Sequence, residues 1–165
     1  MIRLRDYDAT DAPRLVELAN NENVSRFLIY TFPFPYTMKD ADWWIATGSN
    51  ANGAKTKVIE YDGAFIGSVG ITPQVGWKSH TAEIGYWLGE EFWGRGIASQ
   101  VLKQMTEDAF SEGMWEKLFA PVLAPNRASA RVLEKNGFHL EGILKNEVIK
   151  NGQMYDILHY ARIRT

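Results

Sequence analysis

Apolar and polar residues alternate in residues 2–7 and 80–89, which predicts two short β-strands. Two longer alternating segments, 55–73 and 138–163, are each long enough for two strands and the turn between them. Residues 117–125 are mostly apolar and predict a further strand with little exposure to solvent.

Both long alternating segments contain a dipeptide that favours a tight turn. Asp62-Gly63 interrupts the first segment and Asn151-Gly152 interrupts the second. Asp-Gly and Asn-Gly adopt the left-handed backbone conformations that two-residue hairpin turns require. Each segment is therefore predicted to form a β-hairpin.

Apolar residues recur at three- and four-residue spacing in four other segments, which predicts helices over residues 9–20, 38–48, 96–110 and 126–138. A shorter helix is predicted over residues 22–29. The apolar stripe of the third helix consists of Ile97, Val101, Leu102, Met105 and Ala109.

Polar residues at the ends of these helices have the chemistry of caps. Asp11 and Asn126 are predicted N-caps of the first and fourth helices. Thr37 precedes the second helix, and Asp40 follows three residues later, as in a capping box. Gly137 is predicted at the C′ position of the fourth helix.

The segment 30–37, with the sequence YTFPFPYT, is predicted to be a stiff aromatic loop, because Pro33 and Pro35 prevent a helix. The elements then follow as strand, helices, three strands, helix, strand, helix and two strands. Such an order indicates a mixed α/β sheet, and we expect residues 1–165 to form a single domain.

The composition excludes several classes of function. Hydrophobic residues make up 45% and charged residues 23% of the 165 residues, and the formal net charge is −2, so a nucleic acid is not the expected direct partner. The chain has no cysteine, which excludes disulfides and thiolate chemistry. Neither a signal peptide nor a membrane segment is recognisable, and we expect a cytoplasmic protein.

Two glycines, Gly94 and Gly96, flank one residue just before the third helix, in the segment WGRGIA. A helix N-terminus with glycines attracts anions, although such a pair is also common in simple turns. The dinucleotide pattern fails because Ser99 replaces its third glycine. The P-loop spacing is met from Gly89, but the required Lys-Ser/Thr pair is absent.

A third pattern, the acyl-coenzyme A loop, fits this segment better. Three segments in order, AEIGYWLGEEFWGRGIASQVL, PNRASARVLEKNGFHLEGILK and NGQMYDILHYARI, resemble the GCN5-related N-acetyltransferase (GNAT) superfamily. The resemblance extends over nearly the whole chain and is closest to the branch of ribosomal-protein alanine and serine N-terminal acetyltransferases. It implies an α/β fold with a mostly antiparallel sheet, a splayed central parallel strand pair and flanking helices.

The resemblance implies a binding site for acetyl-CoA, with the backbone N–H groups of the loop holding its pyrophosphate. Residue 93 is Trp here, where the superfamily pattern has Gln or Arg. The residues expected to bind the coenzyme are Trp87, Leu88, Arg95, Gly96, Ile97, Ala98, Ser99 and Asn126. Asn126 is equally well explained as a simple helix cap.

For the chemistry, the resemblance places Ser129 near the coenzyme sulfur, although a solvent-facing helix serine is the alternative. The superfamily often has a tyrosine acid where this chain has Leu133. Glu83 is the candidate general base, because an ammonium substrate must lose a proton before it attacks. A cross-strand ion pair is the alternative role for Glu83. The glutamate used by the ribosomal branch aligns here with Val148.

The amine acceptor is the least determined partner. Tyr30, Phe32, Phe34 and Tyr36 are expected to line its site, or else to cap the core. The acceptor is expected to be the α-amine of a protein or peptide N-terminus, with a small amine or a non-catalytic coenzyme-binding module as alternatives. The three histidines are scattered, so no metal site is expected, and the oligomeric state stays open between monomer and homodimer.

Overall fold

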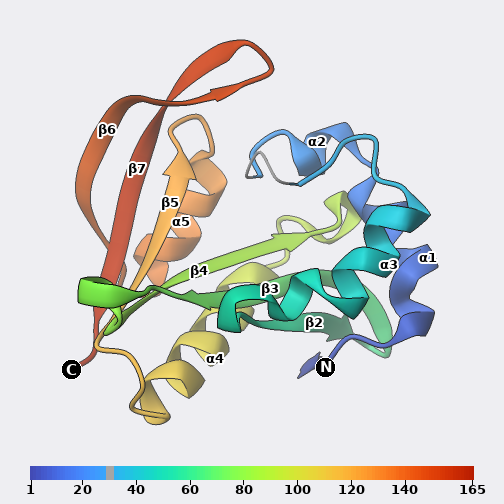
Figure 1. Cartoon of the computed structure of the whole chain (residues 1–165), viewed down its shortest axis with the longest axis horizontal. Helices are drawn as coiled ribbons and strands as arrows, with labels where there is room; N and C mark the ends of the chain where they lie inside the picture. Colours follow the sequence, from blue (N-terminus) through green and yellow to red (C-terminus); the bar gives the residue numbers. More distant parts are fainter. Residues whose placement is uncertain (29–31) are drawn as a thin grey trace.

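A seven-stranded sheet with the strand order β1-β2-β3-β4-β5-β7-β6 forms the centre of the molecule (Figure 1). The structure is a computed structural model and describes residues 1–28 and 32–165. The strands are β1 (Ile2–Arg5), β2 (Lys55–Tyr61), β3 (Ala64–Pro73), β4 (Thr81–Leu88), β5 (Lys117–Leu123), β6 (His139–Lys150) and β7 (Gln153–Ile163). Only β4 and β5 pair in parallel, so the predicted mixed, mostly antiparallel sheet is confirmed.

Both predicted hairpins are present, and their turns have the expected backbone conformation. Asp62 and Gly63 connect β2 to β3 with φ values of 49° and 83°. Asn151 and Gly152 connect β6 to β7 with φ values of 52° and 75°. Two consecutive residues with positive φ are characteristic of the turns whose twist matches that of paired strands.

Helices cover both faces of the sheet, and the sheet divides the core into two parts. The helices are α1 (Ala12–Ala19), α2 (Glu22–Ser25), α3 (Met38–Ala46), α4 (Ile97–Ser111) and α5 (Arg127–Lys135). The smaller core lies between β2, β3 and the helices α1 and α3, whereas α4 and α5 pack on the opposite face. Val58 and Ile59 are neighbours on β2 and point to opposite faces, as strand alternation requires. Val58 packs in the smaller core under α1 and α3, and Ile59 packs in the larger core under α4 and α5.

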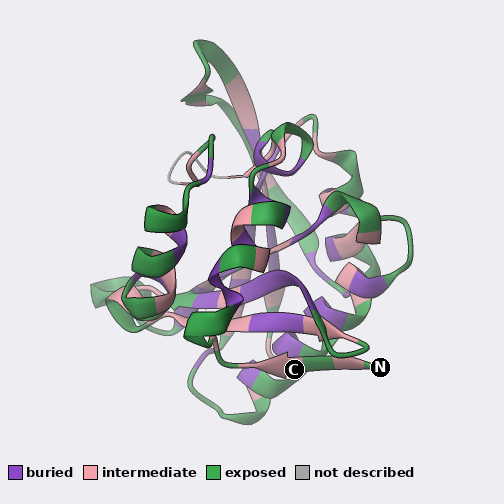
Figure 2. Ribbon diagram, turned by 90° about the vertical axis from the view of Figure 1, so that its right-hand side faces the viewer, coloured by how far each residue is buried: buried purple, intermediate pink, exposed green. Residues whose placement is uncertain are grey.

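Burial follows this layered arrangement (Figure 2). Every residue of the stripe predicted for α4 is buried, because the stripe lies on the sheet. The outer part of the hairpin formed by β6 and β7 projects from the rest of the sheet and is largely exposed. The core under α4 and α5 therefore does not extend along this outer part of the hairpin.

Three of the predicted caps are confirmed. Thr37 and Asp40 form a reciprocal capping box at α3, and the Asn126 side chain accepts a hydrogen bond from the backbone of Ser129 in α5. Gly137 has a φ of 77° just after α5, as the C′ position requires.

The prediction for Asp11 is wrong in its chemistry. Asp11 precedes α1, but its side chain makes no capping hydrogen bond to that helix. Its carboxylate instead accepts two hydrogen bonds from Arg5, at 2.7 and 2.8 Å, and one from the backbone of Asp8. A charged partner on β1 therefore takes the carboxylate that a local pattern assigns to the helix end.

The helix predicted over residues 22–29 is shorter than expected, since α2 ends at Ser25. Residues 29–31 lie outside the described part of the chain, so the prediction for that end of the segment has no structural counterpart. The helix predicted over 38–48 ends at Ala46.

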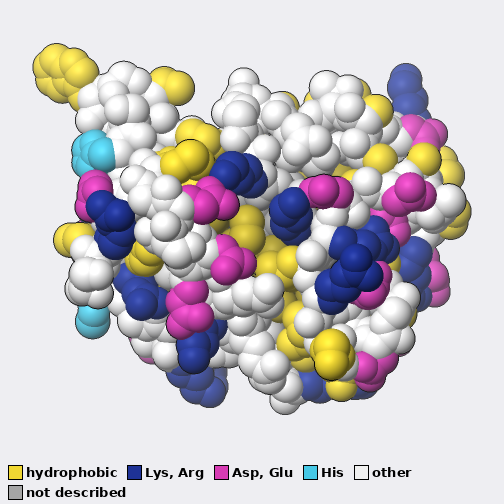
Figure 3. Space-filling model, turned by 90° about the horizontal axis from the view of Figure 1, so that it is seen from below, with side chains coloured by type: hydrophobic (Ala, Val, Ile, Leu, Met, Phe, Trp, Pro, Cys, Tyr) yellow, Lys and Arg dark blue, Asp and Glu magenta, His cyan; other side chains and the backbone are white. Residues whose placement is uncertain are grey.

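Acidic and basic side chains are interspersed on the surface shown in Figure 3, and neither sign forms a continuous patch there. Among the residues that the structure describes, no helix is both long and apolar enough to cross a membrane.

Replacing Arg5 by alanine is expected to lower the free energy of unfolding by about 3 kcal/mol at pH 7, because it leaves a buried carboxylate unpaired. The Asp11 side chain is only 7% exposed. Burial alone raises the pKa of Asp11, but the hydrogen bonds from Arg5 and the Asp8 amide outweigh burial, and the net pKa is lowered. The stabilisation is thus complete above a pH of about 4 and disappears as the pH falls through this lowered pKa.

Urea denaturation at pH 7 and at pH 3 measures the difference between the R5A variant and the native protein. The control is Lys57→Ala, which removes an exposed ion pair with Asp6 and is expected to cost about 1 kcal/mol or less. If the R5A protein is as stable as the K57A control at pH 7, the pairing of Arg5 with the buried Asp11 carboxylate does not stabilise the fold as expected.

Candidate active site

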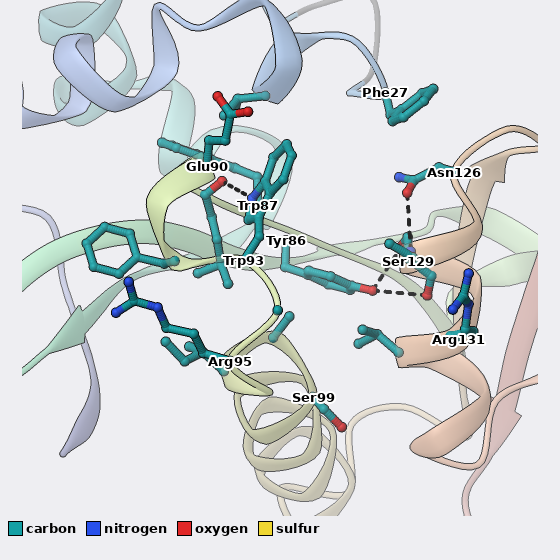
Figure 4. Close-up of a pocket in the computed structure, with 18 of the residues that line it drawn as sticks. Phe27, Tyr86, Trp87, Glu90, Trp93, Arg95, Ser99, Asn126, Ser129 and Arg131 are labelled. Atoms are coloured by element: carbon teal, nitrogen blue, oxygen red, sulfur yellow. Dashed lines mark hydrogen bonds between the residues drawn. The ribbon is translucent and has the colours of Figure 1, made fainter.

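A pocket of about 700 Å³ opens where β4 ends and lies between the N-terminal parts of α4 and α5 (Figure 4). Segments far apart in the sequence form its walls. They are residues 23–28 with α2, the end of β4, the loop before α4, the first turn of α4 and one face of α5. The pocket brings together nine residues singled out from the sequence: Trp87, Leu88, Arg95, Gly96, Ile97, Ala98, Ser99, Asn126 and Ser129.

The N-terminus of α4 opens onto this pocket without a side-chain cap. Gly96 occupies the N-cap position with a φ of 74°, and a Cβ atom at this position meets nothing within 4 Å. The first intrahelical hydrogen bond runs from Gln100 N to Gly96 O at 3.2 Å, so the three preceding amides have no acceptor in the helix. Amides in this position, at the positive end of a 15-residue helix, bind anions.

Trp93 holds the loop before α4 in place. Its indole Nε1 donates a hydrogen bond of 2.8 Å to the carbonyl of Leu88, which ends β4. Arg95 lies above the ring of Phe92, with 5.6 Å from its guanidinium carbon to the ring centre. The tryptophan that departs from the superfamily pattern therefore fixes the loop against the strand.

The walls of the pocket separate because β4 and β5 stop pairing. The parallel ladder contains three residues of each strand and ends at Glu83 and Phe119. Beyond that point β4 continues to Leu88 and β5 to Leu123 without pairing to one another. The predicted splay of the parallel pair is thus confirmed.

The side chain of Tyr86 reaches from β4 to α5 across this gap (Figure 4). Its hydroxyl lies 3.0 Å from Ser129 Oγ and 3.4 Å from the carbonyl oxygen of Ser129. The Ser129 N–H in turn donates to Asn126 Oδ1 at 3.2 Å. Burial raises the pKa of Tyr86 to about 12, although the hydrogen bond with Ser129 acts in the opposite direction.

Three cationic side chains line the pocket close to the two helices. Arg95 belongs to the loop, and Arg131 and Lys135 lie one turn apart on α5. Asn136 connects the two helices, since its Nδ2 donates to Ser99 Oγ at 3.0 Å. The Ser99 hydroxyl is thereby engaged in structure, whereas its backbone amide belongs to the uncapped turn of α4.

The residues that follow Asn21 form a wall that the sequence did not predict. Val24, Phe27 and Leu28 line the pocket there. Glu90 accepts hydrogen bonds from the side chains of Asn21 and Asn23, both at 2.8 Å, and so holds this segment against the loop. No pattern within residues 21–28 indicates this contact, because its partner is almost 70 residues away.

Lys150 holds the same segment from the other side. Its ammonium group donates to the backbone carbonyls of Ser25 and Leu28, and burial lowers the pKa of this lysine. The end of β6 therefore meets the end of α2 across the opening between the two halves of the molecule.

Glu83 does not line the pocket and lies instead at the point where the strands part. Its side chain is half-buried beside Phe119 of β5, and burial raises its pKa. Within residues 1–28 and 32–165 no hydrogen bond or ion pair of its carboxylate is present, so a cross-strand ion pair does not account for it there.

The aromatic loop contacts the site at one residue of the described part. Phe32 packs edge-on against Trp87, with 5.6 Å between ring centres. Tyr36 is only 5% exposed and belongs to the core under α1 and α3, whereas Phe34 is 51% exposed. Tyr30 lies outside the described residues.

Leu133 occupies the position at which the superfamily often has a tyrosine acid, and it is fully buried in the core. The pocket face of α5 consists of Ala128, Ser129, Arg131, Val132 and Lys135. These positions are three or four residues apart, as expected for one face of a helix. Arg131 and Lys135 could therefore have been predicted from their spacing to Ala128. Among the described residues no three His, Asp or Glu side chains are grouped to hold a metal ion.

Comparison with known proteins agrees with this architecture. The sequence model described as "Acetyltransferase (GNAT) domain" matches residues 2–139. The "Putative ribosomal N-acetyltransferase YdaF" of Bacillus subtilis (strain 168) is 28% identical over 171 residues, which cover 99% of this chain and 91% of that protein.

Two solved structures have the same fold. One is RimL, a ribosomal alpha-N-protein acetyltransferase in complex with coenzyme A, with a TM-score of 0.86 and 27% identity over 98% of this chain and 93% of that one. The other is MccE, the microcin C7 self immunity acetyltransferase in complex with acetyl-CoA and AMP, with a TM-score of 0.86 and 26% identity over 98% and 92%. The chain is therefore a member of the GNAT acetyltransferase family.

Proposed function

We propose that this chain acts as a single N-acetyltransferase domain over residues 1–165 and moves the acetyl group of acetyl-CoA to a primary amine. The observation that carries the proposal is the uncapped, glycine-led start of α4, which lies in one pocket with the gap between β4 and β5. Membership of the acetyltransferase family supports it. The transfer is direct, with donor and amine bound at the same time.

The pocket suits acetyl-CoA along its whole length. The free amides of Ile97, Ala98 and Ser99 suit a pyrophosphate, and Arg95, Arg131 and Lys135 supply cations for the remaining phosphate charge. Beyond Glu83 the backbone of β4 does not pair with β5 and suits an extended chain that carries amide groups. This path ends near Ser129, where a sulfur atom is in reach of a hydroxyl.

When bound, acetyl-CoA supplies an acetyl group activated as a thioester. Backbone N–H groups of β4 in the gap polarise its carbonyl. Glu83, at the apex of the gap, takes a proton from the incoming ammonium, directly or through one water molecule. The Ser129 hydroxyl donates a hydrogen bond to the departing sulfur.

The acceptor that we propose is the α-amine of a protein or peptide N-terminus. Two relatives described as ribosomal acetyltransferases, YdaF and RimL, support this choice. We place the amine on the side of Glu83, with Phe32 and Phe34 of the aromatic loop as candidates for its walls. Tyr36 is buried in the core, and Tyr30 lies outside the described residues. A small amine is the second candidate, because the similar structure MccE is described as a microcin C7 self immunity acetyltransferase and not as an acetyltransferase of ribosomal proteins.

Thiol release from acetyl-CoA tests the function directly. N-terminal peptides and small amines are offered in parallel, and release with at least one peptide is the expected result. Release only with small amines moves the acceptor to the second candidate. Tight binding of coenzyme A without thiol release for any acceptor contradicts the proposed enzymatic activity and indicates a coenzyme-binding module.

Replacing Gly96 by aspartate is expected to weaken coenzyme A binding about tenfold or more, because a carboxylate then faces the amides that hold the pyrophosphate. Isothermal titration calorimetry measures the dissociation constant. The matched control is Gly152→Asp, since Gly152 has nearly the same φ, 75°, and a Cβ there also meets nothing within 4 Å. Equal affinities for the G96D and G152D proteins exclude an anion site at the start of α4.

Replacing Glu83 by glutamine is expected to lower kcat/KM about 100-fold and to remove one inflection from the pH profile. A base must be ionised, so the native rate falls as the pH drops through the pKa of Glu83, which burial raises. The variant is expected to be at least as stable at pH 7, because burial disfavours the lost charge.

The control for Glu83 is Glu91→Gln, which removes an exposed carboxylate paired with Arg14. Kinetics between pH 5 and 9 and thermal unfolding are compared for the three proteins. An E83Q protein that is less stable and keeps the native pH profile assigns Glu83 a structural role only.

A further inference from the structure

The hydroxyl of Tyr86 makes contacts that the binding of a coenzyme does not require. It comes from a strand, crosses the gap between β4 and β5 and meets two oxygen atoms of one residue, Ser129, 43 positions later in the chain. Tyr86 and Ser129 both line the pocket. The contact is therefore made at the surface that receives the donor.

Hydrogen counting distinguishes two arrangements of this pair. A tyrosine hydroxyl has one hydrogen and so does a serine hydroxyl. If Ser129 donates to Tyr86, the serine hydrogen is used within the protein. If Tyr86 donates to Ser129 Oγ, at 3.0 Å, the serine hydrogen is free to point into the pocket.

The rest of Ser129 is already fixed. Its N–H donates to Asn126 Oδ1 at 3.2 Å, and its position in the first turn of α5 is set by that cap. The serine hydroxyl is thus the one group of this residue that has a choice of direction. A negative charge in the pocket selects the second arrangement, because donors in a chain strengthen one another when the last acceptor is charged.

We propose that Tyr86 is a positioning residue, whose hydroxyl donates to Ser129 Oγ and thereby directs the Ser129 hydrogen onto the sulfur of the departing thiolate. This inference rests on the proposed function and gives the departing sulfur a hydrogen-bond donor in a chain whose position 133, the usual place of the tyrosine acid, is a buried leucine. Tyr86 acts through Ser129 and does not touch the reacting atoms.

The pair stabilises charge and transfers no proton. In the reaction a bond forms between the amine nitrogen and the carbonyl carbon, and the carbon–sulfur bond breaks with its electrons going to sulfur. The proton lost by nitrogen completes the thiol through base and solvent. Since the pKa of Tyr86 is raised to about 12 and that of a thiol is about 8.5, transfer from tyrosine to thiolate is unfavourable.

A double-mutant cycle in kcat tests the coupling. Tyr86→Phe is expected to lower kcat about tenfold, and Ser129→Ala by at least as much, the usual range for a hydrogen bond to a charged group. In the S129A background Y86F is expected to change kcat less than about twofold, because Tyr86 then has no serine to direct. The KM for acetyl-CoA stays within about twofold throughout, as expected for contacts made at the leaving group.

The control is Tyr160→Phe. The Tyr160 hydroxyl donates to Glu134 at 2.8 Å and so connects β7 to α5, but Tyr160 does not line the pocket. This variant loses a hydrogen bond to the same helix and is expected to keep the native kcat. Equal losses of kcat in Y86F and Y160F, or factors for Y86F and S129A that multiply in the double variant, reduce Tyr86 to a structural contact and overturn the proposal.

A binding measurement gives an answer that does not depend on turnover. A donor aimed at sulfur lowers the pKa of the thiol of bound coenzyme A, so affinity rises as the pH passes from below this lowered pKa to the ordinary value of about 8.5. One unit of pKa corresponds to a tenfold gain in affinity. Titration calorimetry with reduced coenzyme A between pH 6.5 and 9.5 is expected to show this rise in the native protein and its loss in Y86F and in S129A.

Other charged groups contribute to the same pH profile and are common to all the proteins compared. Arg26, Glu90, Arg95, Arg131 and Lys135 line the pocket, and Glu83 lies at the apex of the gap. The difference between native and variant profiles isolates the two hydroxyls. A rise in affinity that survives in Y86F overturns the proposal, whereas absent turnover with a normal rise contradicts only the proposed function.

Discussion

Hydrogen bonding of the backbone at the centre of the sheet is the constraint that shapes this site. The ladder between β4 and β5 ends at Glu83 and Phe119, although both strands continue for several residues. Backbone N–H and C=O groups that face such a gap need partners from elsewhere. The proposed donor, an extended ligand with amide groups of its own, suits that need, and the gap shares one pocket with the uncapped start of α4.

The gap is compatible with a stable fold because each strand is paired on its other side. β4 keeps seven paired positions with β3, from Gly67 to Pro73, and β5 keeps seven with β7. Each strand is therefore held by its antiparallel neighbour, and the sheet behaves as two sheets joined along three residue pairs. The core under α4 and α5 continues across this junction, whereas the core under α1 and α3 stays on the side of β2 and β3.

Local patterns predicted the elements, and non-local contacts decided the details of the site. The turn at Asp62-Gly63 and the capping box of Thr37 depend on neighbouring residues, and both were predicted from the sequence. The role of Asp11 depended on Arg5 in another element, so a cap pattern misassigned it. The contact of the Tyr86 hydroxyl was not predicted. The periodicity of a strand predicts which face of the sheet a side chain lies on, but not which distant residue it contacts.

The geometry of α5 explains why the group that we propose to direct the Ser129 hydroxyl comes from outside this helix. Ala130 and Leu133, three residues apart, face the core, whereas Ser129 and Val132, at the same spacing, face the pocket. A hydroxyl at position 133 would be directed into packed apolar side chains. The helix is also fixed at both ends, by Asn126 and by the bond from Asn136 to Ser99, so it cannot rotate to present another face. Tyr86, on the strand that bounds the gap, supplies a hydroxyl at the one point where the pocket face of α5 is within its reach.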